Sequence, residues 1–415
     1  MKNILIITSA YWHDSSVPCG KDMSVLSKLL STSKKIKVTV LTSTLSGGLE
    51  TQEGIACYHL NSETLEAFTE YRQVLIDQYK SVSKVFLKFK LRWQLYWLNK
   101  KIDKKVLIGP HWISFFSLKQ WMQEYQGKAF DLLISVSYPF YIQEYAYQVK
   151  KKLHIKKWIP YLLDPHADNI HCYKDKRKRR GKKENKIFKA CTNIFTVEEI
   201  VTQARYSPIK KFLQKIQYIP THLMTDNTKY QKKNNTDLIH FVYTGLFYPD
   251  IRNPEKLLQY FTQLPNNYIL NLYSRGCVDI VTRYKEILGD RLQINDYILD
   301  QEEYNKMIGQ ADFLVDVGNT VSNQVPSKIL TYCSFGKPII HFKNCKNEVV
   351  GEKFQQYPLF NVVDYSNDIS VVVEEIKNIV KKDFGEAVSY QEIKDNFSEC
   401  TVEYVAENIK NILGE

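Results

Sequence analysis

The sequence predicts an α/β protein with two Rossmann-like, doubly wound domains that face each other across a cleft. Short apolar runs rich in Val, Ile and Leu alternate with helical patterns along the whole chain, which is typical of parallel sheets covered by helices. A chain of 415 residues is too long for one ordinary core, so two domains are expected. The polar stretch 221–237 has the composition of a surface linker between them.

These observations place a first domain at 1–225 and a second at 226–395. The last segment, 396–415, is expected to be a C-terminal helix that could cross back to the first domain. Parallel sheets of this kind bind ligands at the carboxyl ends of their strands. The runs that predict strands lie at 4–8, 37–42, 55–60, 132–136, 158–163, 193–197 and 217–219 in the first half, and at 239–244, 268–273, 292–295, 313–317, 338–341 and 360–363 in the second.

The composition indicates a folded protein with a basic surface. Hydrophobic residues make up 44% of the chain, and the formal net charge is +12. Such an excess of positive charge favours polyanionic partners, namely nucleic acid, an acidic membrane face or phosphorylated substrates. No recognised nucleic-acid motif is present, so a nucleic-acid partner is not expected.

The cysteines and the apolar segments indicate a cytoplasmic location. The eight cysteines form no CxxC pair and no metal-ligand spacing, so we expect reduced thiols and no bound metal. The apolar run that follows Met1 is too short for a signal peptide and predicts a buried first strand. No window approaches the roughly 20 apolar residues that a membrane-spanning helix needs. Any contact with a membrane is therefore expected to be peripheral.

Several residues of the second half follow predicted strands and could bind phosphate. Gly245 lacks a Cβ, so a ligand could approach the backbone closely. Arg252 precedes a predicted helix, and its guanidinium could bind a diphosphate through two hydrogen bonds, although a pairing with Glu255 or with solvent is the plain alternative. Arg275 at the end of the next strand is a second possible cation. Asp316 lies in a strand of buried type that breaks at Gly318.

The loop and helix at 323–340 carry the most specific pattern in the chain. A loop that enters a helix presents free backbone N–H groups, which bind phosphate well. The segment reads Asn-Gln-Val-Pro-Ser-Lys-Ile-Leu-Thr-Tyr-Cys-Ser-Phe-Gly-Lys-Pro-Ile-Ile. It closely resembles the Pro-Ser-Lys-x-x-Glu-Tyr-x-x-x-Gly-Lys-Pro-Ile-Ile pattern of GT-B glycosyltransferases, specifically the retaining group 1 type (glycosyltransferase family 4).

The resemblance implies a role for individual residues of this pattern. Lys328 would lie beside the β-phosphate of a nucleoside-diphosphate sugar, and Ser327 would take part in donor binding or cap the helix. Family members usually carry a ribose-binding Glu where this chain has Thr331, and another Glu near the donor sugar where it has Asn323. Both replacements can form hydrogen bonds but carry no charge. Family members commonly carry an Arg directly after the glycine, where this chain has Leu246, and a Lys about seven residues on. Arg252 falls near that Lys position, so the resemblance implies that it is a cation for the diphosphate.

In the first half, the resemblance implies the acceptor side of the site. Gly20 lies in a loop where two glycines are common in the family. Ser137 ends a predicted strand, and Asp164 and His166 follow the next one, in a succession similar to the family's Trp-Ile-x-Asp-x-Arg-Asp-Pro-Trp. We expect Asp164 to take part in catalysis, and Gly20, Ser137 and His166 to face the acceptor. A structural role for each is the alternative.

Two segments of the first half suit an anionic membrane surface. Within 84–105, Lys84, Lys88 and Arg92 recur at helical spacing, and so do nearby aromatic residues. The basic loop 174–183 reads Lys-Asp-Lys-Arg-Lys-Arg-Arg-Gly-Lys-Lys, and each cation near an anionic surface contributes roughly 1 kcal/mol. The alternative is that the aromatic face packs on the first domain and the loop is solvated.

The sequence therefore predicts a metal-independent glycosyltransferase that needs no cofactor other than its nucleoside-diphosphate-sugar co-substrate. It would transfer a hexose with retention to a lipid-linked or glycan acceptor in bacterial capsule or exopolysaccharide assembly, on the inner face of the cell membrane. The alternatives are a nucleotide-sugar epimerase of the same architecture and a non-catalytic partner subunit that binds a nucleotide sugar.

Overall fold

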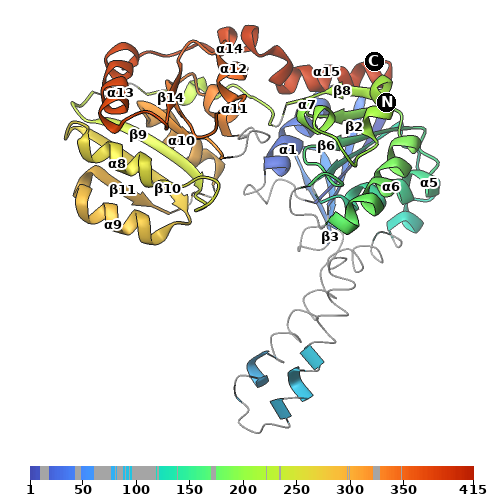
Figure 1. Ribbon diagram of the computed structural model, residues 1–415. Coiled ribbons are helices and arrows are strands. Elements are labelled where there is room, and N and C mark those ends of the chain that lie inside the picture. The colour runs from blue at the N-terminus through green and yellow to red at the C-terminus, as the bar shows by residue number, and fades with distance from the viewer. Residues whose placement is uncertain are drawn as a thin grey trace. The chain divides into compact units, whose positions relative to one another are not determined.

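The computed structural model contains two compact units, each built on a mainly parallel sheet (Figure 1). The first unit comprises Met1–Ile219 and Ala406–Glu415, and the second comprises Pro220–Val405. The residues that the structure describes are 1–9, 18–42, 48–59, 76–79, 81, 87–88, 90–92, 94–95, 118, 121–137, 139–169, 174–220, 222–232, 235–296, 298, 300–320, 328–346 and 348–415. The prediction of two Rossmann-like domains is confirmed.

The sheet of the first unit has eight strands in the order β3-β4-β2-β1-β5-β6-β7-β8. All neighbours are parallel except β3 and β4. The apolar runs of the central strands are almost fully buried, as expected for strands covered on both faces, whereas the edge strand β8 is partly exposed. The strands are β1 (Lys2–Thr8), β2 (Ile36–Thr42), β3 (Gly48–Gln52), β4 (Ile55–His59), β5 (Leu132–Ser137), β6 (Lys157–Leu162), β7 (Ile194–Thr196) and β8 (Ile216–Tyr218).

The sheet of the second unit has six parallel strands in the order β11-β10-β9-β12-β13-β14. Strand β9 lies in the middle, where the chain order reverses, and a strand order of this kind places ligands at the carboxyl ends near the reversal. The strands are β9 (Ile239–Leu246), β10 (Tyr268–Arg275), β11 (Leu292–Asn295), β12 (Phe313–Val317), β13 (Ile339–Lys343) and β14 (Phe360–Asp364).

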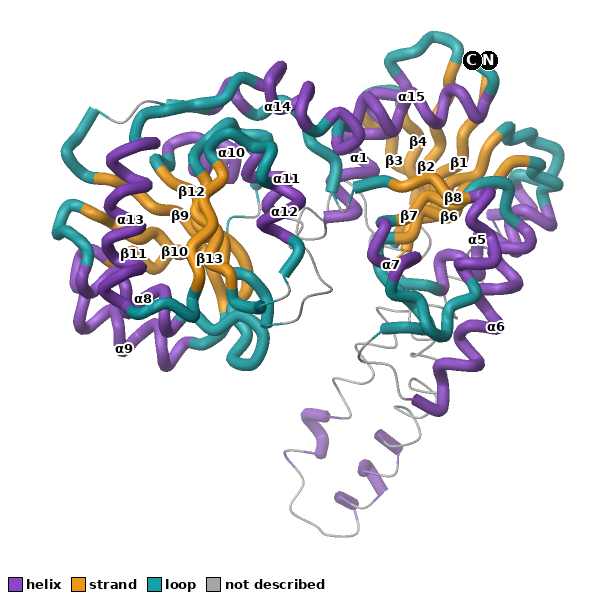
Figure 2. Tube along the Cα trace, turned by 45° about the horizontal axis from the view of Figure 1, so that its top comes forward, coloured by secondary structure: helices purple, strands orange, loops and turns teal. Residues whose placement is uncertain are grey.

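The helices connect the strands and pack on the sheets (Figure 2). None of the helices in the described part of the chain combines the length and apolar composition needed to cross a bilayer. Those used below are α1 (Pro18–Ser31), α5 (Tyr141–Lys152), α6 (Lys174–Ala190), α10 (Gln301–Gln310), α11 (Lys328–Cys333), α12 (Val350–Phe354), α13 (Ile369–Asp383) and α15 (Val402–Leu413). The others are α7 (Glu198–Thr202), α8 (Glu255–Gln263), α9 (Val278–Leu288) and α14 (Tyr390–Asn396).

Every predicted strand is present, with ends that differ by at most two residues. The pattern of apolar runs does not predict β3, which is short, largely polar and begins at Gly48. Its antiparallel pairing with β4 is closed by Glu53 and Gly54, whose φ angles of 51° and 79° are typical of a two-residue hairpin turn. The glycine of this turn was the local signal for the hairpin, whereas Glu is not a usual residue at the first turn position.

The basic segment 174–183 is not a loop, as the sequence analysis expected, but the first part of α6. Its Lys and Arg residues favour helix formation. The interior Gly181 is needed for packing, because a Cβ at this position would lie 2.5 Å from the carbonyl oxygen of Tyr206. Of segment 84–105, the described residues are 87–88, 90–92 and 94–95, so the predicted aromatic stripe lies outside them.

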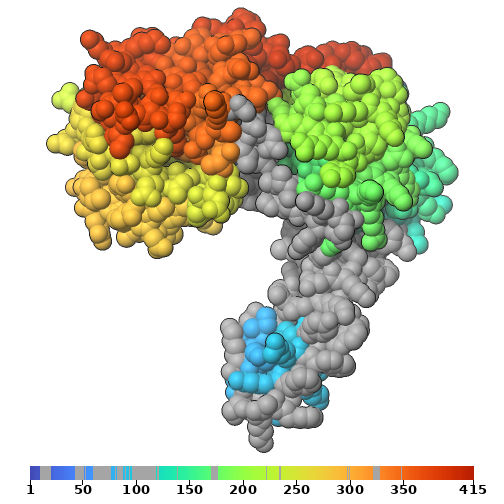
Figure 3. All heavy atoms as spheres, in the orientation of Figure 1, coloured from blue at the N-terminus to red at the C-terminus, as the bar shows by residue number. Residues whose placement is uncertain are grey.

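The predicted linker and the C-terminal segment both have defined places. In the described part of 221–237, Leu223 and Met224 are buried, and the Met224 N–H donates to the Cys400 carbonyl, so this stretch packs on the second unit. The end of α15 belongs to the first unit, where Ile409 and Leu413 are buried and Lys157 donates to the carbonyl of Ile412. The chain ends lie side by side in both ribbon views, and the red C-terminal residues lie along the green surface of the first unit (Figure 3).

Candidate functional site

Lys328 and Asp316 form a buried ion pair at the carboxyl end of the second sheet. The Asp316 side chain is fully buried on β12, and that of Lys328, the first residue of α11, is 14% exposed. The Lys328 Nζ atom lies 3.2 Å from Asp316 Oδ1 and donates a hydrogen bond of 3.1 Å to the Thr244 carbonyl. It also lies 3.8 Å from the centre of the Tyr243 ring, a cation–π contact.

The spacing of Lys328 and Tyr332 explains part of the sequence pattern. Residues four apart share one face of a helix, and here that face packs on the end of β9. The backbone N–H of Thr244 donates to the Tyr332 hydroxyl over 3.0 Å, while the carbonyl of Thr244 accepts from Lys328. One residue of β9 is therefore held by both ends of a single helical turn.

His341 continues the charge cluster on the far side of Asp316. In the register between β12 and β13, Asp316 and His341 are direct partners. The Nδ1 atom of His341 lies 2.6 Å from Asp316 Oδ2, and its Nε2 atom lies 3.1 Å from Glu348 Oε2. Both ring nitrogens lie near carboxylate oxygens, and this arrangement favours the doubly protonated imidazolium.

The cluster changes the pKa of each group in a way that follows from burial and charge. Burial alone would raise the pKa of Asp316, but the charges of Lys328 and His341 outweigh it and hold that pKa below its ordinary value. Burial lowers the pKa of Lys328 to about 7, although Asp316 opposes the shift. Burial would also lower the pKa of His341, yet its hydrogen bonds to Asp316 and Glu348 raise it to about 9.

Gly245 and Arg252 lie beside this cluster. The φ angle of Gly245 is +124°, which favours glycine, and a Cβ there would lie 3.7 Å from the Lys328 Nζ atom. The Nη2 atom of Arg252 donates to Asn319 Oδ1 over 2.8 Å, and the charge of Arg252 acts on both Asp316 and Lys328. The structure thus brings together four of the predicted residues, from three segments of the chain: Gly245, Arg252, Asp316 and Lys328.

Of the remaining predicted donor residues, two lie outside this cluster and two lie outside the described residues. Arg275 is exposed at the end of β10 and pairs in register with Leu246, one residue beyond Gly245. Thr331 lies on α11, partly exposed, with its carbonyl accepting from the Ser334 hydroxyl. Asn323 and Ser327 lie outside the described residues.

The Gly-Lys-Pro part of the motif has a structural role in the second unit. Gly336 has a φ angle of +66°, and a Cβ there would lie 2.1 Å from the Val388 carbonyl oxygen. The neighbouring Lys337 is buried and donates to the carbonyl of Lys232 over 3.0 Å. These contacts fix the turn between α11 and β13. The Lys337 amine is used in one of them, a hydrogen bond within the second unit.

In the first unit, three of the predicted residues gather at the ends of β5 and β6. Ser137 is buried and pairs in register with Leu162, two residues before Asp164. The His166 ring stacks on Phe140 with a centroid distance of 3.8 Å. Gly20 is buried near the start of α1. The Asp164 side chain is exposed, yet the atoms packed around its carboxyl group raise the pKa of that group above its ordinary value.

Helix α6 fixes the loop that carries His166. Arg180 donates to the His166 carbonyl over 3.1 Å, and the Ala167 N–H donates to the buried Glu184 over 3.1 Å. Burial, together with the charges of Arg180 and Lys183, lowers the pKa of His166 to about 3, so its ring is neutral. Burial raises the pKa of Glu184 to about 7. A neutral imidazole can accept a proton or a hydrogen bond, which an imidazolium cannot.

Sequence reasoning missed His341, Glu348 and Tyr332. His341 lies within an apolar run that predicts only a strand, and Glu348 follows in a loop, so their pairing depends on the sheet register. Tyr332 was visible, because the family pattern carries a Tyr four residues after the Lys. Within the described ranges, no group of three or more His, Cys, Asp or Glu residues is arranged to hold a metal ion.

No protein-family model and no curated protein sequence matches this chain. Its fold does match solved structures that it covers almost completely. Sucrose-phosphate synthase from Thermosynechococcus elongatus aligns with a TM-score of 0.61 at 12% identity, over 99% of this chain and 98% of that one. Anabaena HepE in complex with UDP and glucose aligns with a TM-score of 0.60 at 11% identity, over 100% of both chains. The lipopolysaccharide outer core galactosyltransferase WaaB aligns with a TM-score of 0.52 at 12% identity, over 99% and 98%. The chain therefore has the two Rossmann-like domains of the GT-B fold.

Proposed function

We propose that the protein is a glycosyltransferase that takes a sugar from a nucleoside-diphosphate sugar. The observation that carries this proposal is the Lys328 amine, held on the Thr244 carbonyl next to Gly245 at the carboxyl end of the central strand. An amine beside a glycine at such a strand end can bind a phosphate that approaches the backbone closely. Structures with the same fold contain UDP, which supports UDP-sugars as the first donors to test.

The proposed chemistry is mainly electrostatic. Breaking the bond between sugar and diphosphate leaves negative charge on the departing oxygen, and fixed cations stabilise that charge. Lys328 and Arg252 would supply these cations, with Arg275 as a further candidate one strand away. We propose transfer of a hexose with retention and without a metal ion, in line with the family that the motif resembles.

Asp164, Ser137, His166 and Gly20 are proposed to serve the acceptor. Asp164 follows β6, and its carboxyl group, whose pKa is raised above the ordinary value, is proposed to exchange a proton with the acceptor. The acceptor that we propose is lipid-linked or a glycan, as in capsule or exopolysaccharide assembly. The donor contacts of Asn323, Ser327 and Thr331 remain proposals from the motif.

We further propose that α6 attaches the protein to an anionic membrane surface on the cytoplasmic side. The basic residues of α6 divide into two groups. Arg177 stacks over Tyr206, Arg180 holds the His166 carbonyl, and Lys183 pairs with Glu144. The second group consists of exposed cations: Lys176, Lys178, Arg179, Lys182, Lys186 and Lys189; of these, Lys186 also lies over the Tyr147 ring. These exposed charges support attraction to anionic lipid.

The donor proposal is tested by a thermal-shift screen of the purified protein against UDP, GDP, ADP and their sugar conjugates, followed by an assay of sugar transfer with and without EDTA. We expect one nucleotide to raise the melting temperature, and transfer to survive the chelator. The double variant R252A/K328A should lose transfer, whereas K377A should not, because Lys377 lies on the surface of α13 and pairs with Glu374. Full activity in R252A/K328A would contradict the proposed roles.

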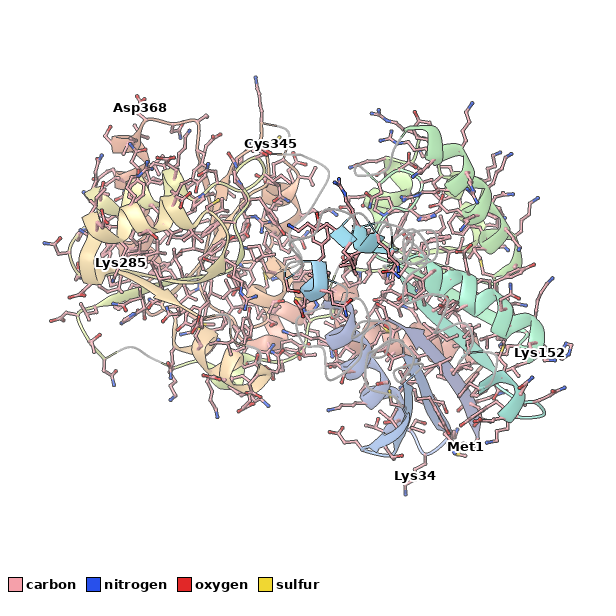
Figure 4. All side chains as sticks on the ribbon, turned by 90° about the horizontal axis from the view of Figure 1, so that it is seen from below. Met1, Lys34, Lys152, Lys285, Cys345 and Asp368 are labelled. Atoms are coloured by element: carbon pink, nitrogen blue, oxygen red, sulfur yellow. The ribbon has the colours of Figure 1, made fainter. Side chains whose placement is uncertain are left out.

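The membrane proposal is tested by co-sedimentation with vesicles of phosphatidylcholine, alone or mixed with anionic phosphatidylglycerol. We expect binding only to the anionic vesicles, weaker at high salt, and reduced in K178Q/R179Q/K182Q. The matched control is K151Q/K152Q/K156Q, which removes the same charge from exposed lysines at and after the end of α5, where Lys152 extends outward (Figure 4). Equal loss in both variants would show a non-specific effect of net charge.

One alternative is favoured by a specific observation. Thr331 occupies the position of the ribose-binding Glu in the family that the motif resembles. A protein that binds a nucleotide sugar without turnover could tolerate a change at this position. Such a non-catalytic partner subunit would give a thermal shift with UDP but no transfer. Transfer that appears only after a second subunit is added would support this alternative.

A further inference from the structure

The most unusual feature outside the proposed contacts is the row of three buried ionisable side chains Asp316, His341 and Glu348. The three come from β12, β13 and the loop before α12, and their side chains are 0%, 0% and 4% exposed. Burying two carboxylates and an imidazolium is costly unless they pair closely. The row ends at Asp316 Oδ1, 3.2 Å from the Lys328 amine.

The structure around the row shows that its geometry is fixed. A Cβ on Gly318 would lie 2.5 Å from Glu348 Oε1, so the carboxylate of Glu348 packs directly on that glycine. The Gly318 N–H donates to the carbonyl of Phe342, which anchors the strand ends to each other. The His341 ring stacks near Phe360, with a centroid distance of 5.8 Å. Cys345, in the same loop as Glu348, is marked in Figure 4.

Charges of opposite sign lie next to Lys328. The Asp316 carboxylate favours the protonated amine, while the imidazolium behind it offsets part of that negative charge. The positive charge of Arg252 lowers the pKa of Lys328. Three tyrosines also face Asp316, namely Tyr243, Tyr332 and Tyr365, and burial raises the pKa of each well above its ordinary value, so they stay neutral.

We propose that His341 is a positioning residue for the donor diphosphate: held between Asp316 and Glu348, its imidazolium offsets the Asp316 carboxylate and so sets the charge that Lys328 presents to the phosphate. This proposal rests on the proposed function, because it assigns the diphosphate to Lys328. The proposal means that the Lys328 amine loses its proton more easily than the amine of a lysine paired with an isolated aspartate. An amine of this kind holds a diphosphate firmly at low pH and releases it as the pH rises.

The first test does not depend on any ligand. Competitive labelling with acetic anhydride, read by mass spectrometry, follows the reactivity of the Lys328 amine against pH in the full chain. In the unaltered protein we expect a midpoint near 7. In H341Q we expect a higher midpoint, because Asp316 then acts without the opposing imidazolium. The double variant H341Q/E348Q should show the same upward shift. It also removes the Glu348 carboxylate, which H341Q alone would leave buried and unpaired. The double variant can therefore be measured if H341Q does not fold.

A matched control separates this effect from a general loss of stability. Asp383 is another buried carboxylate of the second unit, which accepts a hydrogen bond of 2.8 Å from Asn361. D383N should lower stability and leave the labelling midpoint of Lys328 unchanged. An unchanged midpoint in folded H341Q would overturn the positioning role and leave His341 a structural residue.

The second test measures the affinity for UDP against pH. We expect the affinity of the unaltered protein to fall as Lys328 loses its proton, and the fall to occur at higher pH in H341Q by the same amount as the labelling midpoint. The ionisation of UDP is the same for every variant, so the difference between variants reports the protein. If the unaltered protein binds no nucleoside diphosphate, the proposed function fails. If it binds UDP and the variants keep its pH dependence, only the role of His341 fails.

Discussion

The amine of Lys328 lies 3.2 Å from the buried carboxylate of Asp316, and together they close the carboxyl end of the central strands in the second unit. Lys328 is the first described residue of α11, and Asp316 is the penultimate residue of β12. The pair therefore joins the start of a helix to the end of a strand. Because the Lys328 pKa is about 7, the cluster is poised to gain positive charge when an anion arrives.

Replacing Lys328 by Met should weaken nucleotide binding. Methionine keeps most of the length of the side chain and removes its charge. A hydrogen bond to a charged group contributes about 1.5–3 kcal/mol, so we expect a loss of UDP affinity of roughly 10- to 150-fold. Isothermal titration at pH 6, where the Lys328 amine is protonated, measures it, with K377A as the control. Equal affinities for K328M and the unaltered protein would contradict the phosphate contact.

Replacing Tyr332 by Phe should lower stability without changing the charge of the site. The variant leaves the buried N–H of Thr244 without its partner, which costs about 1–3 kcal/mol. All six tryptophans precede residue 160, so tryptophan fluorescence reports the first unit alone. Urea unfolding is followed with two probes. We expect the midpoint measured by circular dichroism to fall, and the midpoint measured by tryptophan fluorescence to stay unchanged. An unchanged dichroism transition would contradict the role of this hydroxyl.

Replacing Gly245 by Ala should strain β9. The φ angle of +124° is rarely adopted by residues with a Cβ, and such strain costs about 1–3 kcal/mol. The matched control is G351A on α12, where φ is ordinary and a Cβ would only touch Val362 at 3.5 Å. Since alanine favours helices, G351A should leave stability unchanged or raise it slightly. Equal unfolding free energies for the two variants would contradict the strain at Gly245.

Apart from β3, the strands could be predicted from the sequence, and so could the position of Lys328 where a loop enters a helix; in both cases the reason is local. Continuous apolar runs mark buried parallel strands, and Lys328 stands in a motif whose spacing is fixed by one helical turn. The sequence was insufficient for His341 and Glu348, because their contacts depend on the register of β12 against β13, which no local pattern reveals. It also predicted a loop at 174–183, where the polar residues belong to a helix that holds the His166 loop.

The pH dependence of stability in the first unit should depend on Glu184. Burial raises the pKa of its carboxyl group to about 7 in the folded protein, from an ordinary value of 4.5 in the unfolded chain. The folded state therefore binds this proton more tightly, so the contribution of Glu184 to stability is fully present below pH 4.5 and is lost as the pH rises through 7.

In E184Q the side chain is neutral at every pH, so this loss should disappear. We expect the free energy of unfolding of E184Q, relative to the unaltered protein, to increase by roughly 1–3 kcal/mol between pH 5 and pH 8. Urea titrations followed by tryptophan fluorescence measure the first unit directly. The control is E144Q, because Glu144 lies at the surface in an ion pair with Lys183 and should show no such trend. A constant difference between E184Q and the unaltered protein across this pH range would mean that Glu184 is already ionised in the folded state.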